Sequence, residues 1–447
     1  MRKKTRLSGI SGITYNISNG DAHFIVDSKG EVYAWGSNED GELGIGSEDD
    51  SKNQSEPVKI NGLSNIEKIY IQRHSIFAQT NIGEIYSWGN ISHGILGVES
   101  EQNINAPIKI EGLTGIKKLY LDYNVAFAIN DLGEIYSWGD NSNGQLGIGI
   151  GNEEDQTVPA KVNDIKGIKE LYYNNNFNTV FALNRFGEVY SWGANYFNQL
   201  GTGDNIDKSV PTKIIGLTNV TKIYNNGSSA YARLSTGDVY AWGFNEYGEL
   251  GIGDIENQRI PAKVTGLANV EEIYNEDEQG NTIFRTKDGE LYSCGRNYNY
   301  LLGIGIGDEE CVNTPVKISG VTGVDEVVRN WQYILVKTQN GEVYSWGTNE
   351  YGNCGVGNTE IQKVPAKVKN IDNVESIIDG MYLKSSDGKL YAPNGDTNKY
   401  EVFEPVENMY DGNNHVEKVT IKYVNVEKIT IYMSDGSIYR FNLSMPS

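Results

Sequence analysis

The chain has 447 residues, of which 38% are hydrophobic and 22% charged, and its formal net charge is −21. This hydrophobic fraction can supply a sizeable core, so the composition excludes an intrinsically disordered chain. The acidic balance excludes nucleic acid as the direct partner, because binding to phosphates needs a concentrated basic face, and no apolar run approaches the ~20 residues that cross a membrane.

A short string that begins Gly-x-[Val/Ile/Leu]-Tyr recurs throughout the sequence. Seven closely similar copies lie at Gly30–Gly36, Gly83–Gly89, Gly133–Gly139, Gly187–Gly193, Gly237–Gly243, Gly289–Gly295 and Gly341–Gly347, and two weaker copies lie at Gly388–Asn394 and Gly436–Asn442. The first glycines of successive copies are 53, 50, 54, 50, 52, 52, 47 and 48 residues apart. A period of this length indicates a propeller or a solenoid.

Each repeat predicts four antiparallel strands, which we call A to D. In the second repeat they cover residues 67–71, 76–80, 84–88 and 107–110, where residues alternate with period 2 between Gly, Asn and Pro. No helix is predicted. Strand C carries apolar residues on both faces, which suits a sheet packed between two other sheets. We therefore predict an all-β fold, a β-propeller of four-stranded antiparallel blades.

We predict a single domain over residues 1–447, with nine repeat units that start near residues 9, 62, 112, 165, 216, 266, 320, 370 and 415. The last unit supplies strands at 417–422, 427–433 and 437–442 but lacks a fourth. Residues 4–13 align with residues 57–66, so Thr5–Ser8 is predicted to be a D strand that pairs with the last unit and closes the ring. The alternative is a ring of seven blades with a C-terminal extension.

The sequence does not determine the cellular compartment of the protein. The basic residues at the start of the sequence are not followed by the apolar segment of a signal peptide. A cytoplasmic protein, or a secreted protein whose signal has been removed, is compatible with this pattern. The abundance of Ile, Asn, Lys and Tyr is typical of a low-GC bacterium.

The longer pattern Gly-x-[Val/Ile/Leu]-Tyr-x-Trp-Gly-x-Asn-x-x-Gly-x-Leu-Gly, complete at 30–44, 133–147 and 237–251, resembles the regulator-of-chromosome-condensation repeat. The resemblance covers the first seven units well and the last two only through Gly-x-[Leu/Ile]-Tyr. It implies a β-propeller of four-stranded blades, usually seven. That family contains nucleotide-exchange factors for a small GTPase, modules of ubiquitin ligases, and a bacterial branch that resembles β-lactamase-inhibitor proteins, so the fold does not choose a function.

Residues that recur in every repeat are interpreted as architecture. The Tyr and Trp of strand C are predicted to pack between blades, the glycine before strand C to adopt a positive φ, and the Asn of Trp-Gly-x-Asn to bond its local backbone. Cys294 and Cys354 replace a repeated Trp and Leu and are predicted to be core residues, whereas Cys311 is placed in a loop. No disulfide is expected, because the count is odd and the spacing irregular.

The sequence predicts no enzyme, no cofactor and no metal site. The four histidines are scattered, and neither a catalytic triad order nor a phosphate-binding loop is present. Residues 140–144 weakly resemble a calcium loop but lack its later glutamate, so calcium stays an open alternative.

The A–B and C–D loops vary most between repeats, and in a four-stranded antiparallel sheet they emerge at the same end. The B–C and D–A turns are short and alike, so the opposite end is interpreted as structural. Variable loops on a rigid frame are where binding usually occurs. The predicted partner-binding residues are Arg73, His74, Tyr123, Tyr173, Phe177, Trp331 and Tyr333 in the A–B loops, and Tyr196, Phe197, Phe244, Tyr247, Tyr298, Tyr300 and Tyr351 in the C–D loops.

We therefore expect a monomeric, non-enzymatic scaffold that binds a protein through these loops, as an inhibitor or an adaptor. Acidic runs at 48–50, 153–155, 276–278 and 308–310 lie in the same loops and favour a partner with a basic surface. Regulation of a small GTPase and recognition of carbohydrate or a cell surface are the alternatives.

Overall fold

The computed structural model describes residues 10, 12–46, 52–149, 155–276, 279–378, 380–394, 399–402, 416–422, 427–433 and 438–443. The predicted closing strand Thr5–Ser8 lies outside these residues. Neither of the two short helices in the described ranges is long and apolar enough to cross a membrane.

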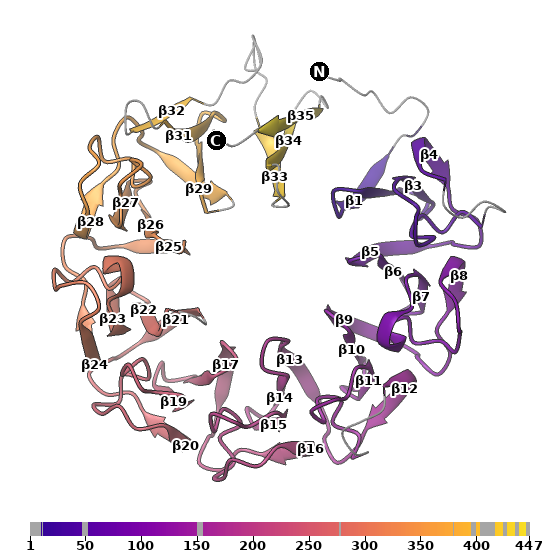
Figure 1. The fold of residues 1–447 in the computed structure, drawn as a ribbon, viewed down its shortest axis with the longest axis horizontal. Coiled ribbons are helices and arrows are strands. Elements are labelled where there is room, and N and C mark those ends of the chain that lie inside the picture. The colour runs from indigo at the N-terminus through magenta and orange to yellow at the C-terminus, as the bar shows by residue number, and fades with distance from the viewer. Residues whose placement is uncertain are drawn as a thin grey trace. The chain divides into compact units, whose positions relative to one another are not determined.

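The described strands form eight four-stranded sheets and one three-stranded sheet, each with its strands in chain order (Figure 1). The first four sheets comprise β1 Ile13–Ser18, β2 Ala22–Asp27, β3 Val32–Gly36 and β4 Gln54–Lys59; β5 Ile66–Gln72, β6 Ser75–Thr80, β7 Ile85–Gly89 and β8 Ile104–Lys109; β9 Ile116–Asp122, β10 Val125–Asn130, β11 Ile135–Gly139 and β12 Gln156–Val162; β13 Ile168–Asn174, β14 Thr179–Asn184, β15 Val189–Gly193 and β16 Lys208–Lys213.

The remaining sheets follow the same plan. They comprise β17 Val220–Asn225, β18 Ser229–Leu234, β19 Val239–Gly243 and β20 Gln258–Lys263; β21 Val270–Glu276, β22 Asn281–Thr286, β23 Leu291–Arg296 and β24 Cys311–Lys317; β25 Val324–Arg329, β26 Tyr333–Thr338, β27 Val343–Gly347 and β28 Gln362–Lys367; β29 Val374–Ile378, β30 Tyr382–Ser385, β31 Leu390–Asn394 and β32 Lys399–Val402; and β33 Val416–Lys422, β34 Glu427–Met433 and β35 Ile438–Leu443. The four strands predicted per repeat are thus confirmed for the first eight repeats.

Two predictions about local structure are wrong. Single-turn 3-10 helices occur at Ser92–Gly94 (η1) and Tyr298–Tyr300 (η2), both in C–D connections where no helix was predicted. Each holds a residue in the left-handed region, His93 and Asn299, which keeps the turn from extending into a longer helix. Cys311 is the first residue of β24 rather than a loop residue.

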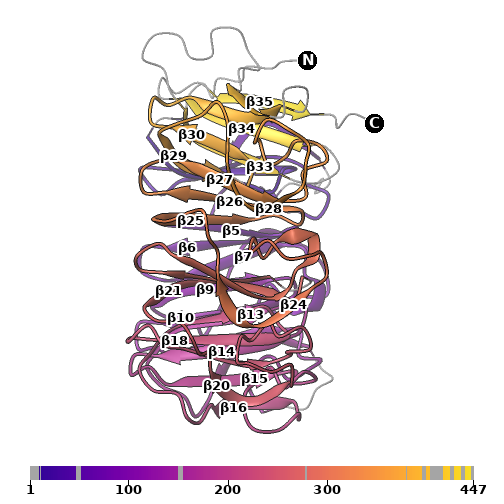
Figure 2. The same cartoon turned by 90° about the vertical axis from the view of Figure 1, so that its left-hand side faces the viewer.

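The chain separates into two compact parts, which we describe one at a time. The N-terminal half is built on Leu7–Ala232 and Arg259–Pro261, and the C-terminal half on Arg233–Gln258 and Ala262–Ser447. Within each half the first strands of neighbouring sheets touch, as β1 does with β5 and β25 with β29. Figure 2 shows β25 to β28 of the C-terminal half from the side. The single-domain prediction stays a prediction.

In four of the described sheets, the strand-C tryptophan joins its sheet to the sheet before it. Trp88, Trp138 and Trp192 are fully buried, and their indole nitrogens donate to carbonyl oxygens of the preceding sheet's C–D loop at 2.9, 2.7 and 2.8 Å. Trp346 does the same in the C-terminal half, at 2.9 Å. The predicted packing of Trp between sheets is confirmed, and it includes a satisfied indole N–H.

The strand-C tyrosines are less buried than predicted. Tyr33, Tyr190 and Tyr344 are only half-buried, and each hydroxyl donates to a glutamate two residues earlier in the chain. Because a tyrosine hydroxyl needs a polar partner, the ring stays at the edge of the core.

The Leu-Gly step after strand C makes room for the next tryptophan. Gly147 has a φ of +71°, and a Cβ atom built on it would lie 2.6 Å from the indole nitrogen of Trp192. The step is held by Asn141, whose Oδ1 accepts from the Leu146 amide at 3.1 Å, and by Ser137, whose Oγ donates to the Leu146 carbonyl at 2.7 Å. The repeated Asn therefore bonds its local backbone, as predicted, but five residues ahead.

The close approach of Gly147 to Trp192 can be tested by substitution. Gly147→Ala should destabilise the fold by about 3 kcal/mol or more, because it adds a steric clash to the cost of a left-handed alanine. Gly62→Ala is the matched control, since Gly62 has a φ of +82° and no atom within 4 Å of the added Cβ. Calorimetric melting should show a much larger fall for Gly147→Ala, and equal falls would contradict the packing argument.

Candidate functional site

The A–B and C–D loops of neighbouring sheets meet at one end of each half, as the antiparallel order requires. In the N-terminal half, the Asn19 side chain donates to the Arg73 carbonyl at 2.8 Å, which joins two A–B loops. The amides of Asn90 and Asn103 donate to the Asp40 carboxylate at 3.2 and 2.8 Å, which joins two C–D loops. These hydrogen bonds between neighbouring loops thus fix the positions of the loops that carry the variable residues.

Five of the predicted residues expose large aromatic side chains on these loops. In the N-terminal half, the side chains of Tyr123 and Tyr196 are 46% and 68% exposed. In the C-terminal half, Trp331 and Tyr351 are 58% and 71% exposed, and Tyr298 is also exposed. Because the repeated tryptophans are mostly buried, exposed rings of this size are a property of the variable loops.

Charged side chains lie beside some of these rings. The guanidinium of Arg73 stacks 3.8 Å from the ring centroid of Tyr123, and the ammonium of Lys363 lies 5.1 Å from that of Tyr300. His74 Nδ1 lies 3.5 Å from carboxylate oxygens of both Asp40 and Glu42 of the preceding sheet's C–D loop. These pairs orient the loop side chains.

Other predicted residues pack against their own neighbours. The rings of Phe177 and Phe197 meet edge to face at 5.8 Å, and those of Phe244 and Tyr247 at 6.0 Å. The guanidinium of Arg296 covers Tyr247 from the next sheet, 5.1 Å from the ring centroid. These four aromatic residues are only partly available to a partner.

The placement of two residues in the loops is wrong. Tyr333 is the first residue of β26 and only 4% exposed, because it lies in the buried second strand of its sheet. Tyr173 lies in β13, where its ring packs 5.6 Å from that of Phe127 and its hydroxyl donates to Asn178 at 2.9 Å. Neither side chain belongs to the loop surface.

The opposite end of the N-terminal half carries an apolar row that the sequence did not predict. Ile82, Leu132 and Phe186 occupy the same place in the B–C turns of three successive repeats, and Phe186 is 65% exposed. The sequence does contain a sign of this row, because an apolar residue directly precedes the first glycine of the repeated string in three successive repeats. The B–C turns therefore also carry exposed apolar side chains, and they are an alternative binding surface to the A–B and C–D loops.

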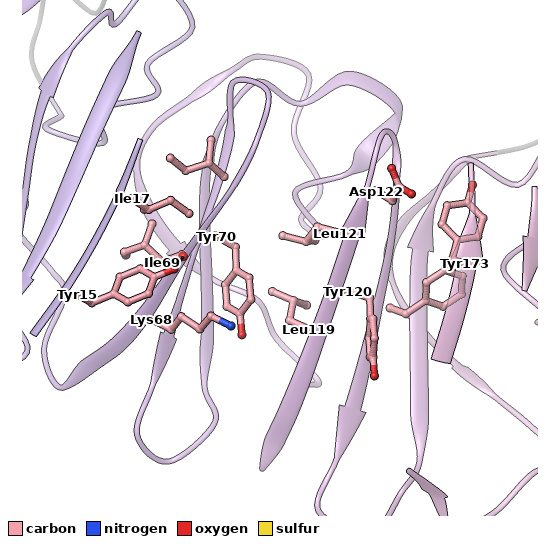
Figure 3. A pocket seen from close by; sticks show the side chains of 12 residues that line it. Tyr15, Ile17, Lys68, Ile69, Tyr70, Leu119, Tyr120, Leu121, Asp122 and Tyr173 are labelled. Atoms are coloured by element: carbon pink, nitrogen blue, oxygen red, sulfur yellow. Dashed lines mark hydrogen bonds between the residues drawn. The ribbon is translucent and has the colours of Figure 1, made fainter. Parts of the chain in front are cut away.

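A cavity of about 490 Å³ lies along the first strands of consecutive sheets in the N-terminal half (Figure 3). Leu119 and Leu121 point toward Tyr70 from the neighbouring strand. Burial raises the pKa of Tyr70 to about 12, and its hydroxyl donates to Gln79 at 2.8 Å. Tyr120 likewise donates to Glu170, at 3.1 Å, across to the next sheet. The cavity tyrosines thus hold strands and sheets together.

Sequence reasoning missed this row of tyrosines. Tyr70 and Tyr120, which line the cavity, belong to a tyrosine position that recurs in strand A, at Tyr70, Tyr120, Tyr172, Tyr224 and Tyr274. Recurrence and internal hydrogen bonds both favour architecture over ligand binding.

The acidic runs are only partly described. Residues 48–50, 153–154 and 277–278 lie outside the described residues. Asp155 pairs with His93 Nδ1 at 3.1 Å, and Glu309 pairs with Arg296. In the described ranges no group of three or more His, Cys, Asp or Glu side chains is arranged to hold a metal ion.

One buried carboxyl stands under the loops of the C-terminal half. Glu249 is buried, and its Oε2 accepts from the Tyr247 amide at 3.0 Å. The equivalent positions hold Gln145 and Gln199, whose Oε1 atoms make the same bond at 2.8 and 2.7 Å. Burial raises the pKa of Glu249 to about 7.

Successive four-stranded antiparallel sheets with this repeat define the β-propeller class of repeat proteins. The family model for the regulator of chromosome condensation (RCC1) repeat matches residues 29–72, 83–119, 133–170, 187–224, 236–274, 288–330 and 340–379. The chain belongs to the RCC1 repeat family.

Several known proteins are similar to this chain. The ultraviolet-B receptor UVR8 of Arabidopsis thaliana is 27% identical over 378 residues, which span 83% of this chain and 84% of that protein. The E3 ubiquitin-protein ligase HERC2 of Homo sapiens is 27% identical over 344 residues, 74% of this chain but only 5% of HERC2. HERC2 is therefore similar over one small portion of its length.

The solved structure of WBSCR16 shows the same fold. Human WBSCR16 aligns with a TM-score of 0.50 and 20% identity over 78% of this chain and 95% of that chain. Prp20p of Saccharomyces cerevisiae aligns with a TM-score of 0.48 and 24% identity over 76% of this chain and 86% of that chain.

The raised pKa of Glu249 predicts a dependence of stability on pH. The pKa of Glu249 is about 7 in the folded protein, above its ordinary value of 4.5. The folded state therefore binds the proton more tightly than the unfolded state does, and the free energy of unfolding falls as the pH rises from about 4.5 to about 7. Glu249→Gln should match the wild type at pH 4 and be more stable at pH 8, by at most about 3 kcal/mol. Melting temperatures measured across this range test it, and an equal difference at both ends would contradict it.

Proposed function

We propose that this protein is a non-enzymatic protein-binding scaffold, an inhibitor or adaptor, whose variable A–B and C–D loops hold a partner. The observation that carries the proposal is the exposure of Tyr196, Trp331 and Tyr351 on those loops, while recurring tryptophans such as Trp192 and Trp346 are buried. Exposed Tyr and Trp supply large contact areas at low entropic cost and dominate the energetics of protein interfaces.

The charge of the chain supports a basic partner. At a net charge of −21, long-range attraction speeds association with a positively charged protein more than it raises affinity. The rate of association should therefore fall steeply with salt, as screening shortens the range of attraction.

The relatives are compatible with this proposal and also offer a second function. A secretion-regulating guanine nucleotide exchange factor of Bos taurus is 34% identical over 77 residues, which cover 17% of this chain. Acceleration of nucleotide release from a small GTPase would favour that function, in which the loops would still bind a protein.

Loop substitutions test the proposal. Partners captured by the wild type and identified should bind Trp331→Ala and Tyr196→Ala with affinities weakened by about 2 kcal/mol or more each, if the two rings are hot spots. Phe186→Ala is the matched control, because it removes an equally exposed ring from the opposite end of the N-terminal half. Calorimetric titration that finds a loss only for Phe186→Ala would move the site to the B–C turns and contradict the proposal.

We further propose that nine repeat units form the ring and that Thr5–Ser8 supplies the strand missing from β33–β35. The support is the alignment of residues 4–13 with 57–66 and the three-stranded last sheet of the described chain.

Replacement of Thr5–Ser8 by glycine and serine tests this closure. It should lower the melting temperature by several degrees, about what the loss of an edge strand costs. Truncation after Asn394 should then be destabilising too. A truncated chain that melts like the wild type would favour a ring of seven blades.

A further inference from the structure

The cavity along the first strands of the N-terminal half has one apolar wall and one wall that carries a cation. Leu119 and Leu121 of β9 point toward Tyr70 of β5 (Figure 3). Lys68 stands on the same face of β5 as Tyr70, because residues two apart in a strand share a face, and its ammonium lies 4.5 Å from the centroid of the tyrosine ring. This part of the cavity, which we call the β5–β9 groove, therefore joins an aliphatic surface to a positive charge.

The groove is accessible from solvent and has the size of a ligand site. Lys68 is exposed, and Tyr70 and Leu121 are half-buried. The cavity volume of about 490 Å³ falls within the range of about 300–1,000 Å³ that is typical of small-molecule sites, which are lined mainly by apolar and aromatic side chains with a few polar groups. Size and lining thus suit a small amphipathic molecule.

The aliphatic residues of the cavity are not required by the repeat. The residue after the recurring strand-A tyrosine is Ile71 and Leu121 in the second and third repeats, but Tyr173, Asn225 and Asn275 in the next three. Because the same sheet also forms with an asparagine at this position, the fold does not explain why the residue is aliphatic beside the cavity. A site for an apolar ligand does explain it.

The tyrosine hydroxyls that line the cavity already donate their hydrogens within the protein. Tyr15 donates to the Ile69 carbonyl at 3.1 Å, Tyr70 to Gln79 at 2.8 Å, Tyr120 to Glu170 at 3.1 Å and Tyr173 to Asn178 at 2.9 Å. A hydroxyl has a single hydrogen to donate, whereas an ammonium has three. The ammonium of Lys68 is therefore the donor that the lining side chains offer to a ligand, and it selects an anionic head group.

Asp122 limits the number of negative charges on the ligand. Figure 3 shows it at the other end of the cavity from Lys68, and its carboxylate accepts from the Asn175 amide at 2.9 Å. Burial raises the pKa of Asp122, so the protein stabilises negative charge poorly at this end. The cavity thus favours a ligand with one anionic head over a ligand with an anion at both ends.

We propose that the β5–β9 groove binds a single-chain amphiphile with one anionic head group, of the class of fatty-acid carboxylates. The head group pairs with Lys68, and the aliphatic chain packs on Leu119, Leu121 and the ring of Tyr70. The site lies on the first strands of the sheets and not on the A–B and C–D loops, so it is independent of the proposed function.

The test uses the full chain with decanoate, decanol and decyltrimethylammonium, which carry a negative, no and a positive charge on chains of the same length. Calorimetric titration below the concentrations at which micelles form should show that the wild type binds decanoate most tightly. Octanoate should bind about fifteenfold more weakly than decanoate, because each buried methylene is worth about fourfold in affinity. Decanol bound as tightly as decanoate, or no binding of decanoate, would overturn the proposal.

Lys68→Met keeps the aliphatic stem of the side chain and removes its charge. It should weaken decanoate binding by about twofold to fivefold, the range of one exposed ion pair, and leave decanol binding unchanged. Lys222→Met is the matched control, because the Lys222 ammonium lies 4.7 Å from the ring centroid of Tyr224 in the same arrangement, but that tyrosine is buried. The control should bind decanoate like the wild type, and equal losses in both variants would reduce the effect to net charge and contradict the site.

Leu121→Asn tests the apolar wall with a residue that the fold accepts at this position, since the fifth and sixth repeats have Asn225 and Asn275 there. Decanoate and decanol should both bind about tenfold more weakly, because the chain loses an aliphatic contact whatever its head group. Melting temperatures of the variants show that the fold is kept. Unchanged affinity for both ligands in a folded Leu121→Asn variant would overturn the proposal, and Lys68→Met decides alone if that variant does not fold.

Discussion

The contact between a strand-C tryptophan and the preceding C–D loop is the interaction on which the rest of the fold depends. It combines a buried ring, whose burial is worth on the order of 3 kcal/mol, with an indole N–H bonded to a loop carbonyl, as in Trp192 with Gln145 at 2.8 Å. One repeat has Cys294 in place of the strand-C tryptophan. Its thiol takes the place of the indole N–H and lies 3.2 Å from the Glu249 carbonyl oxygen. The hydrogen bond persists although most of the ring volume is gone.

The same contact explains why the loops can vary. In the third and fourth repeats, the backbone of the Leu-Gly step bonds both the Asn five residues before its leucine and the serine of strand C, which fixes the start of the C–D loop. The residues between these fixed points need only span the distance, so their side chains are free to change. Large aromatic side chains at such positions cost the fold little and are therefore available for binding.

Two C–D loops with the same residues, Asn-Glu-Tyr-Gly at 245–248 and at 349–352, show where sequence reasoning about the site stops. Their residues are identical, yet Tyr247 is covered by Arg296 and Tyr351 is open to solvent. The covering residue belongs to the next sheet, about one repeat away in the sequence. Tyr333 was also misplaced, since it directly follows the exposed Trp331 and Gln332 of the loop and is the buried first residue of β26.

Periodicity by itself determined the repeat, the four strands, the positive φ of glycines such as Gly187 (φ +75°) and the burial of the tryptophans. These properties depend on local chain geometry and on an environment that every repeat shares, so a residue at the same position of several repeats has the same structural role in each. Only the tertiary structure decided which loop aromatics are exposed, that Tyr70 and Tyr120 line a cavity, and that Ile82, Leu132 and Phe186 form a row at the opposite end of the N-terminal half. The exposure of a loop side chain depends on which side chains of the neighbouring sheet cover it. The repeat period does not show which side chains of two sheets lie opposite each other.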